Sequence, residues 1–397
     1  MMFMWIIIVL TVASLLTLYL GWRLINPAPL PVKWKVAAWG FVILLLFGQR
    51  LTWFLRREGM MDGISNYVDW LGFLFLGLVS ILVVLMLLRD FPILVRRTLT
   101  GLEKLFVRRS KRPYFIRPNR ERRRFILNAS NAALLAATVP LSGYAVFNAH
   151  KKPKVVHNEL PISDLPKGLD GFTIAQVSDT HIGPTLRRGW MRMVVDEVNE
   201  LKPDVIVHTG DLVDGSVDSL SADVQPVADL SAPHGVFFCT GNHEYYSGVI
   251  PWLKKIMQLG MTPLNNDHRL LDTGKGRILM AGVTDFKSDR IFPAHVSSPF
   301  QAKEGAPDHD VSILLAHQPR SIDEAFEAGF DVQLSGHTHG GQYFPYTLAI
   351  HLFQPYVRGL HLHGDTLLYV NEGTGYWGPP MRLGAGPEIT LHTLKRV

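Results

Sequence analysis

Two histidines stand one residue apart in the stretch LSGHTHGGQ, residues 334–342. In an extended segment, residues i and i+2 point to the same face, so the imidazoles of His337 and His339 could aim at one point in space. The glycines of the stretch would let the backbone turn sharply around that point. Because imidazole nitrogen is a common metal ligand, the pair suggests a metal site. The alternative is that both are structural histidines, because a chain with 16 histidines can contain such a pair without binding a metal.

Four other apolar segments run into polar residues of the same chemical kind. They are FTIAQVS before Asp179 and His181, VIVHT before Asp211 and Asp214, VFFCT before Asn242 and His243, and SILLA before His317. Such apolar strands, alternating with amphipathic segments such as residues 186–201, predict an α/β fold whose sheets are buried on both faces. Open α/β sheets bind ligands beyond the carboxyl ends of their strands, so we expect one shared site.

A site built from these side chains would contain two carboxylates, an amide and several imidazoles. A buried network of Asp–His hydrogen bonds would explain one or two of these residues, but not all of them. Burying Asp179 and Asp211 together without a cation would cost several kcal/mol per ion, and a pair of divalent ions offsets that charge. The single cysteine, Cys239, excludes a Cys-based zinc cluster, so the ligands must be nitrogen and oxygen. Mn, Fe, Zn, Co and Ni all accept such ligands.

The motifs D-x-H, G-D-x-x-D, G-N-H-E, a lone histidine and G-H-x-H follow one another over roughly residues 172–394. Their order and their gaps resemble those of the calcineurin-like metallophosphoesterases. The SGHTHGGQ ending and the later stretch GTGYWGPPMRLG are similar to the membrane-anchored branch of that family, which includes transmembrane proteins with a metallophosphoesterase domain. The N-terminal part of the chain matches this branch in architecture alone.

The resemblance implies a four-layer α/β/β/α sandwich with a dinuclear metal centre. It also implies that His243, next to the asparagine of G-N-H-E, contacts the substrate or the oxygen of the leaving group. The implied metal ligands are Asp179, His181 and His339 for one ion, Asn242, His317 and His337 for the other, and Asp211 for both.

The charges of these groups predict the chemistry of a phosphoesterase. Two divalent ions outweigh the two carboxylates, so the site would attract a phosphate ester, and a hydroxide that bridges the metals would attack phosphorus. We predict His243 and the bridging Asp211 as catalytic residues, with His243 donating a proton or a hydrogen bond to the leaving oxygen. We expect Asp214 to orient a ligand histidine. Arg382, in GPPMRLG, could bind substrate phosphate as a bidentate donor, and a solvated surface arginine is the alternative.

The first 150 residues are more apolar than the rest. Residues 3–22, 36–55, 70–88 and 125–147 predict about four transmembrane helices in an all-α region. Residues 89–124 contain 13 Lys or Arg, so the positive-inside rule makes this loop cytoplasmic and places everything after residue 150 outside the plasma membrane. Arg122, Arg123 and Arg124 also fit a twin-arginine-like export signal, and residues 125–147 could instead form an interfacial helix. Both the span and the signal would export the C-terminal domain.

Residues 151–171 contain three prolines and predict an extended linker between a transmembrane region, residues 1–150, and a metallophosphoesterase domain, residues 172–397. The leading hypothesis is a membrane-anchored, metal-dependent phosphoesterase, a hydrolase of phosphate esters. The alternative is a metal-binding but non-catalytic membrane-tethered binding or sensor module. The tether favours a phospholipid or envelope component as substrate. Because membrane topology explains the basic loop, no specific nucleic-acid partner is expected.

Overall fold

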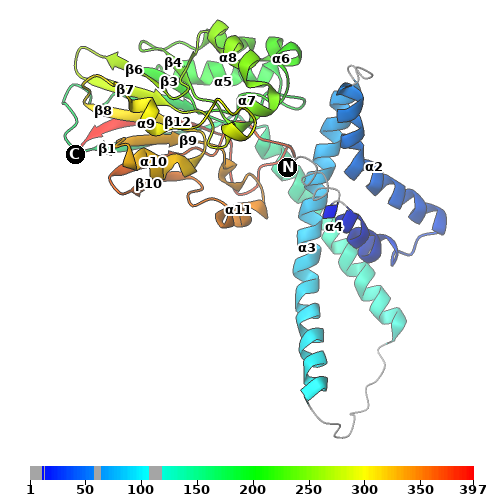
Figure 1. The fold of residues 1–397 in the computed structure, drawn as a ribbon. Helices are drawn as coiled ribbons and strands as arrows, with labels where there is room; N and C mark the ends of the chain where they lie inside the picture. Colours follow the sequence, from blue (N-terminus) through cyan, green and yellow to red (C-terminus); the bar gives the residue numbers. More distant parts are fainter. Residues whose placement is uncertain (1–10, 13, 58–63, 107–118) are drawn as a thin grey trace. The chain divides into compact units, whose positions relative to one another are not determined.

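The computed structural model of the protein describes residues 11–12, 14–57, 64–106 and 119–397. The chain divides into two compact units, residues 1–144 and 145–397. The first unit is built of helices, drawn from blue to cyan in Figure 1, and the second contains sheets as well as helices.

The described part of the first unit is predominantly helical. Its elements are η1 (Gly21–Ile25), α2 (Val32–Arg57), α3 (Ile64–Phe106) and most of α4 (Arg120–Ala149). Two of the described helices, Tyr67–Glu103 and Arg120–Ala149, are long and apolar enough to cross a membrane, whereas Ser14–Ile25 is a shorter apolar helix. Two of the expected spans, at residues 70–88 and 125–147, thus fall on helices of sufficient length.

The other membrane predictions overlap less well with the described residues. The span expected at residues 36–55 lies within α2, and residues 3–10 of the first expected span lie outside the described part. The expected cytoplasmic loop, residues 89–124, is helical up to Phe106, because α3 continues beyond the apolar residues. Leucine, arginine, lysine and glutamate of this stretch favour the helical conformation. Residues 107–118 of that loop lie outside the described part.

The second unit contains two six-stranded sheets. One has the order β1 (Lys154–Ile162), β12 (Glu388–Arg396), β2 (Thr173–Val177), β3 (Val205–His208), β4 (Val236–Phe238) and β5 (Thr262–Pro263). The other has the order β10 (Gly359–His363), β11 (Thr366–Val370), β9 (Val332–Ser335), β8 (Val311–Leu315), β7 (Arg277–Gly282) and β6 (Asp267–Asp272). Strands β2 to β5 run parallel in the first sheet, as do β7, β8, β9 and β11 in the second.

The two sheets pack over a common apolar core. Ile174 and Val207 of the first sheet belong to the same buried cluster as Ile313 and Leu334 of the second. The outer faces are covered by α5 (Arg188–Glu200), α6 (Val217–Val224) and α8 (Val249–Gln258) on the first sheet, and by α9 (Pro299–Lys303) and α10 (Ile322–Glu327) on the second. The observed class is therefore mixed α/β, as the apolar strands predict.

Short helical elements follow several of the strands. They are η2 (Gln225–Asp229), α7 (Asn242–Ser247), η3 (Ser288–Arg290), η4 (Pro319–Ser321), η5 (His339–Gly341), α11 (Tyr346–Ala349) and η6 (Ile350–Leu352). Helix α7 begins shortly after β4, η4 shortly after β8, and η5 shortly after β9. The turns between these strands and helices contain the polar residues that the sequence singles out.

The segment that we expected to be a linker contains a strand. Residues Lys154–Ile162 form β1, which pairs in parallel with β12 from Lys154 opposite Glu388 to Ile162 opposite Arg396. Leu160 and Ile162 are buried in the core between the sheets. This segment is therefore the edge strand of the first sheet, with alternate apolar side chains near its end buried.

The last residues of α4 belong to the second unit. Ala145 and Ala149 are buried, and Ala149 is part of the apolar cluster that contains α5 and α8. The carbonyl of Ala145 accepts a hydrogen bond of 2.9 Å from the backbone N–H of Arg382. The folded unit thus begins before residue 150.

Candidate metal centre

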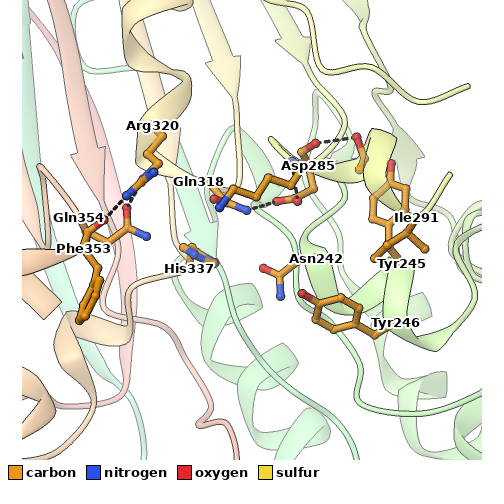
Figure 2. Close-up of a pocket in the computed structure, with 12 residues that line it drawn as sticks. Asn242, Tyr245, Tyr246, Asp285, Ile291, Gln318, Arg320, His337, Phe353 and Gln354 are labelled. Carbon is orange, nitrogen blue, oxygen red and sulfur yellow. Dashed lines mark hydrogen bonds between the residues drawn. The ribbon is translucent and has the colours of Figure 1, made fainter. Parts of the chain in front are cut away.

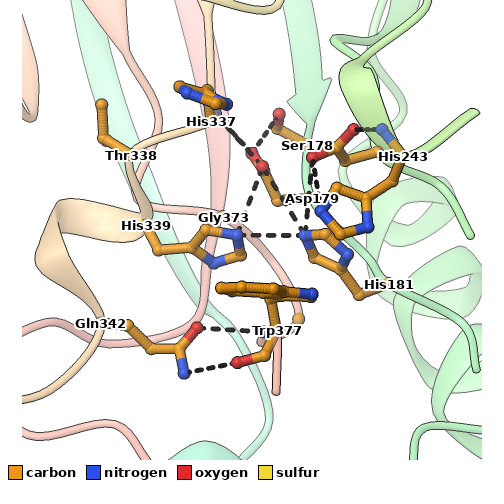
Figure 3. Close-up of polar contacts among 12 residues, drawn as sticks. Ser178, Asp179, His181, His243, His337, Thr338, His339, Gln342, Gly373 and Trp377 are labelled. Atoms are coloured by element: carbon orange, nitrogen blue, oxygen red, sulfur yellow. Dashed lines mark hydrogen bonds and ion pairs between the residues drawn. The ribbon is translucent and has the colours of Figure 1, made fainter. Parts of the chain in front are cut away.

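The polar residues that follow the strands gather at one edge of the two sheets. Asp179, Asp211 and Asn242 follow β2, β3 and β4 of the first sheet, and His317 and His337 follow β8 and β9 of the second. Because these strands are parallel within each sheet, their carboxyl ends meet at the same edge. Both sheets therefore contribute to a single cluster, part of which is drawn in Figure 3.

The first group of side chains consists of Asp179, His181 and His339. The Nε2 atom of His339 lies 3.0 Å from Nε2 of His181 and 3.4 Å from Oδ1 of Asp179. Nε2 of His181 lies 3.9 Å from the same carboxylate oxygen. Figure 3 shows the two imidazoles turned toward each other beside the carboxylate. Three atoms that can ligate a metal thus converge on one point.

The second group consists of Asp211, His317 and His337. Nε2 of His317 lies 3.1 Å from Oδ2 of Asp211 and 3.2 Å from Nδ1 of His337. Oδ2 of Asp211 also lies 3.8 Å from Nε2 of His181, a member of the first group. The possible ligand atoms within each group all lie within 4.8 Å of one another. Asp211, a member of the second group, thus also lies next to the first.

The donor set fits divalent cations. Asp179 and Asp211 are 0% and 2% exposed, so each buried carboxylate needs a strong partner. Oδ1 of Asn242 is buried without a hydrogen-bond partner among the described residues, which is costly unless another group binds it. Burial and the nearby charge of His317 lower the pKa of His337 to about 3, which keeps its imidazole in the neutral form that binds metals.

Asp214 orients two imidazoles of the site. Its Oδ1 atom lies 3.0 Å from Nδ1 of His181 and 2.5 Å from Nδ1 of His243. Although burial opposes it, the two imidazoles hold the pKa of the Asp214 carboxyl below its usual value. A carboxylate at Nδ1 fixes the proton there and directs Nε2 of each ring toward the cluster. His317 is held in the same manner, since its Nδ1 lies 2.8 Å from the carbonyl of Thr209.

His243 forms a third group of possible ligand atoms with His181 and Asp211, next to the two groups described above. Its Nε2 atom lies 4.0 Å from Oδ2 of Asp211, and its backbone N–H donates to Oδ1 of Asp211 at 2.8 Å. Burial alone would lower the pKa of His243, but Asp211 and Asp214 outweigh it and raise the pKa to about 9. The rings of Tyr246 and Trp377 lie edge-on to the imidazole, at 5.2 and 5.7 Å.

Comparison with known proteins agrees with this geometry. Residues 172–341 match the family model of the calcineurin-like phosphoesterases. An uncharacterized metallophosphoesterase of Aquifex aeolicus is 35% identical over 234 residues, which cover 58% of this chain and 87% of the relative. The chain belongs to the calcineurin-like metallophosphoesterase family.

Two vertebrate relatives have a similar combination of parts. A "transmembrane protein with metallophosphoesterase domain" of Danio rerio is 37% identical over 270 residues, covering 66% of this chain and 62% of the relative. A protein of the same name in Bos taurus is 41% identical over 271 residues, which cover 65% of this chain and 61% of the relative. The chain thus spans about three fifths of the length of these two relatives. With the two apolar helices, the names of these relatives support an association of this metallophosphoesterase with a membrane.

Five of the expected metal ligands have a left-handed backbone, which is rare for residues other than glycine. They are Asp179, His181, Asp211, His337 and His339, with φ between 46° and 72°. Such conformations cost about 1–3 kcal/mol each and persist where the surrounding structure imposes them, commonly at functional sites. The cluster of this metallophosphoesterase is therefore built on backbone strain that the two sheets hold in place.

The left-handed backbone of His337 and His339 contradicts our expectation that the two imidazoles aim at one point. Strand β9 ends at Ser335, before either histidine, so His337 and His339 are not on one face of a strand. His337 faces His317, whereas His339 faces His181. The two imidazoles therefore aim at different groups, because each residue turns the chain in the left-handed region.

Two glycines of the motifs make room for carboxylates. A Cβ atom at Gly336 would lie 2.2 Å from Oδ2 of Asp179 and 2.0 Å from Oγ of Ser178. A Cβ atom at Gly241 would lie 2.2 Å from Oδ1 of Asp211. Real side chains cannot approach so closely, so glycine is required at both positions for the metallophosphoesterase cluster to form.

Arg382 does not have the surroundings of a substrate ligand. It is fully buried, and its guanidinium donates to the carbonyls of residues 372, 373, 375 and 386. One of its nitrogens lies 3.3 Å from Nδ1 of His339. Both sequence-based expectations, a phosphate ligand and a solvated surface arginine, are therefore wrong, because the loop between β11 and β12 folds around this side chain. Arg382 supports that loop and the His339 ring.

Sequence reasoning assigned no role to two residues that support the cluster. The hydroxyl of Ser178 donates to Oδ2 of Asp179 at 2.6 Å. Buried Glu244 accepts from the backbone N–H groups of Gly241, Asp211 and Leu212 at 2.7–3.0 Å. The spacing G-x-x-E at the start of α7 is a capping-box pattern, so Glu244 carried a readable signal. Ser178 carried none, because its role depends on the turn after β2.

Replacing Asp214 tests its control of the two imidazoles. We expect Asp214→Asn to weaken metal binding about 10- to 100-fold, because the amide no longer fixes the protons on Nδ1 of His181 and His243. Titration of the metal-free full chain with Mn²⁺ would measure the affinity. Asp218→Asn, an exposed aspartate on α6, is the matched control. Equal affinities in the two variants would contradict the role of Asp214.

Adding one methyl group at Gly336 tests the fit around Asp179. We expect Gly336→Ala to lose most of its bound metal, because the new Cβ collides with Ser178 and Asp179. The metal content of the purified protein, determined by mass spectrometry, is the measurement. Gly189→Ala, in α5 with open space around the added atom, should keep the wild-type content. Full metal content in Gly336→Ala would show that the cluster does not need this close packing.

Proposed function

We propose that this protein is a membrane-anchored phosphoesterase that hydrolyses a phosphate ester with two divalent metal ions. The observation that carries the proposal is the position of Asp211 Oδ2, 3.1 Å from His317 and 3.8 Å from His181, between two groups of ligand atoms. We assign Asp179, His181 and His339 to one ion, Asn242, His317 and His337 to the other, and Asp211 to both. When bound, the ions would polarise the phosphoryl oxygens and activate the attacking water.

The side chains of the protein supply the remaining parts of the reaction. Asp214 holds Nδ1 of His243, so the opposite nitrogen of that ring faces the cluster. A protonated His243 can donate to the leaving oxygen as its bond to phosphorus breaks. The rings of Tyr246 and Trp377 limit rotation of the imidazole. Asp211 has a catalytic role as the carboxylate shared by the two ligand groups.

A cavity beside the cluster provides space for the rest of the substrate. It has a volume of about 290 Å³, and Asn242 and His337, two of the assigned metal ligands, are among the residues that line it (Figure 2). Its size is near the lower limit for small-molecule sites, which indicates a small leaving group or one that extends into solvent. The cavity supports an enzyme more strongly than a binding module, because two of the assigned metal ligands, Asn242 and His337, line it.

The apolar helices support a position at the membrane. We propose that the catalytic unit lies outside the plasma membrane, because the basic residues 89–124 would stay in the cytoplasm and α4 would lead the chain across. Only four residues separate the end of α4 at Ala149 from the start of β1 at Lys154. A catalytic unit tethered by so short a connection favours a phospholipid or envelope phosphoester as substrate.

Hydrolysis of chromogenic esters tests the proposed function. We expect the full chain in detergent with Mn²⁺ to release nitrophenol from 4-nitrophenyl phosphate or bis(4-nitrophenyl) phosphate. Asp211→Asn should reduce the rate about 100-fold or more, because it removes charge from the shared ligand, whereas Asp218→Asn should not. Removal of the metal with EDTA should abolish release. Metal binding without hydrolysis of either ester would favour the non-catalytic module.

A second variant separates metal binding from turnover. We expect His243→Ala to keep its metal but to lose about 10²- to 10⁴-fold in kcat, since the proton donor of the leaving oxygen is gone. His157→Ala, on the edge strand β1, is the control. Metal content and rate are measured on the same preparation. An unchanged rate in His243→Ala would remove this residue from the mechanism.

A further inference from the structure

The cavity beside the metal cluster contains two basic side chains. Arg320 and Lys287 line it together with Asn242 and His337 of the cluster. In Figure 2, Arg320 lies on one side of the pair His337 and Asn242, and Tyr246 lies on the other. A phosphate at the metal side would therefore share the cavity with two cations.

The charge of Arg320 is not compensated by an acidic partner in the part of the chain that the structure describes. Its guanidinium donates to the side-chain oxygen of Gln354 at 3.4 Å and to the carbonyl of Phe353. Both acceptors are neutral, so the side chain is held in place while its positive charge remains available. A guanidinium fixed in this way is suited to binding a carboxylate or a phosphate.

Lys287 is exposed and forms no ion pair with any residue that the structure describes. An exposed lysine is ordinarily only solvated, and Lys287 is distinguished by lining the same cavity as Arg320. The backbone N–H of Lys287 donates to Oδ2 of Asp285 at 3.1 Å, which fixes the start of its side chain. The side chain itself is free to reach a ligand.

Asp285 does not cancel these charges at short range. It is the acidic residue that lines the cavity, and it is 2% exposed. Its Oδ1 accepts a hydrogen bond of 2.8 Å from the side-chain amide of Gln318, and its Oδ2 accepts one from the backbone N–H of Lys287. Its carboxylate oxygens are thus turned to neutral donors of the wall. The open part of the cavity, outside the metal ligands, therefore has an excess of positive charge.

We propose that Lys287 and Arg320 form a second anion-binding subsite, and that the substrate is a phosphate ester whose leaving group carries a further phosphate or carboxylate. The proposal rests on the phosphoesterase function given above, because it places the scissile phosphate at Asn242 and His337. Ile291, Tyr246 and Phe353 also line the cavity and are 49–66% exposed, so an apolar linking group between the two anions meets rings and methyl groups. Substrates that lack the second anion would leave both cations unpaired.

A pair of inert ligands that differ in one charge tests the subsite. The probes are 4-carboxyphenylphosphonate and its neutral, nearly isosteric amide, 4-carbamoylphenylphosphonate, whose C–P bonds cannot be hydrolysed as an ester. Their affinities for the full chain in detergent with Mn²⁺ are measured by calorimetry. We expect the carboxylate to bind about tenfold more tightly, which corresponds to about 1.4 kcal/mol. A third probe, 1,4-phenylenediphosphonate, replaces the carboxylate with a second phosphonate. Whichever of these two ligands binds more tightly shows whether the subsite prefers a carboxylate or a phosphate-like group.

Three variants assign the preference to the two cations. In Lys287→Met the ratio of the affinities for the carboxylate and the amide ligand should fall below ten. In the double variant Lys287→Met/Arg320→Met this ratio should approach one. Lys167→Met is the matched control, since this exposed lysine precedes β2 at the strand end opposite the cluster, and it should keep the wild-type ratio. The metal content of each variant confirms that the cluster is intact. A ratio near one in the wild type, or a full ratio in the double variant, would overturn the subsite.

Hydrolysis of the corresponding phosphate esters distinguishes failure of the subsite from failure of the proposed function. Release of inorganic phosphate from both 4-carboxyphenyl and 4-carbamoylphenyl phosphate, with equal kcat/KM, would overturn the subsite and leave the phosphoesterase. A preference in phosphonate binding without release from either ester, in protein that also hydrolyses neither 4-nitrophenyl phosphate nor bis(4-nitrophenyl) phosphate, would overturn the phosphoesterase and, with it, the substrate class. A preference of about tenfold in both experiments supports the inference.

Discussion

Two almost completely buried carboxylates next to several imidazoles are the constraint that shapes this protein. Asp179 and Asp211 lie within 4 Å of histidine nitrogens at the edge of two sheets. Removing carboxylates from water costs several kcal/mol per ion unless strong partners replace the solvent. Several groups of the second unit act as these partners. The hydroxyl of Ser178, backbone N–H groups and the opposing imidazoles all serve this need.

The strained turns are the means by which parallel strands deliver the side chains. A strand that simply continued would direct alternate side chains to opposite faces of its sheet. A left-handed residue two or three positions after the strand turns the chain, and at Asp179 and Asp211 it brings the carboxylate to the sheet edge. The backbone N–H of His337 then donates to Asp179, which joins the two sheets across the cluster. The apolar core between the sheets offsets the cost of these turns.

Support for the cluster extends to the end of α4. The loop between β11 and β12 is folded around Arg382, whose side chain donates to four carbonyls of that loop and lies beside His339. Its backbone N–H donates to the carbonyl of Ala145, in the last turns of α4. No carboxylate of the described residues forms an ion pair with this buried arginine, which is costly, and burial lowers the pKa of Arg382 to about 10. The loop repays this cost by directing several carbonyl dipoles at the guanidinium.

The sequence by itself determined the family, the mixed α/β class and the identity of the side chains that gather at the cluster. These features depend on local signals, because an apolar strand followed by Asp or His within a few residues is legible without knowledge of its neighbours. The tertiary structure decided the rest. The pairing of β1 with β12, the burial of Arg382 and the shared cavity of Lys287 and Arg320 join residues that lie tens to hundreds of positions apart. Which distant residues meet depends on how the sheets and loops pack, and no local pattern of letters encodes that packing.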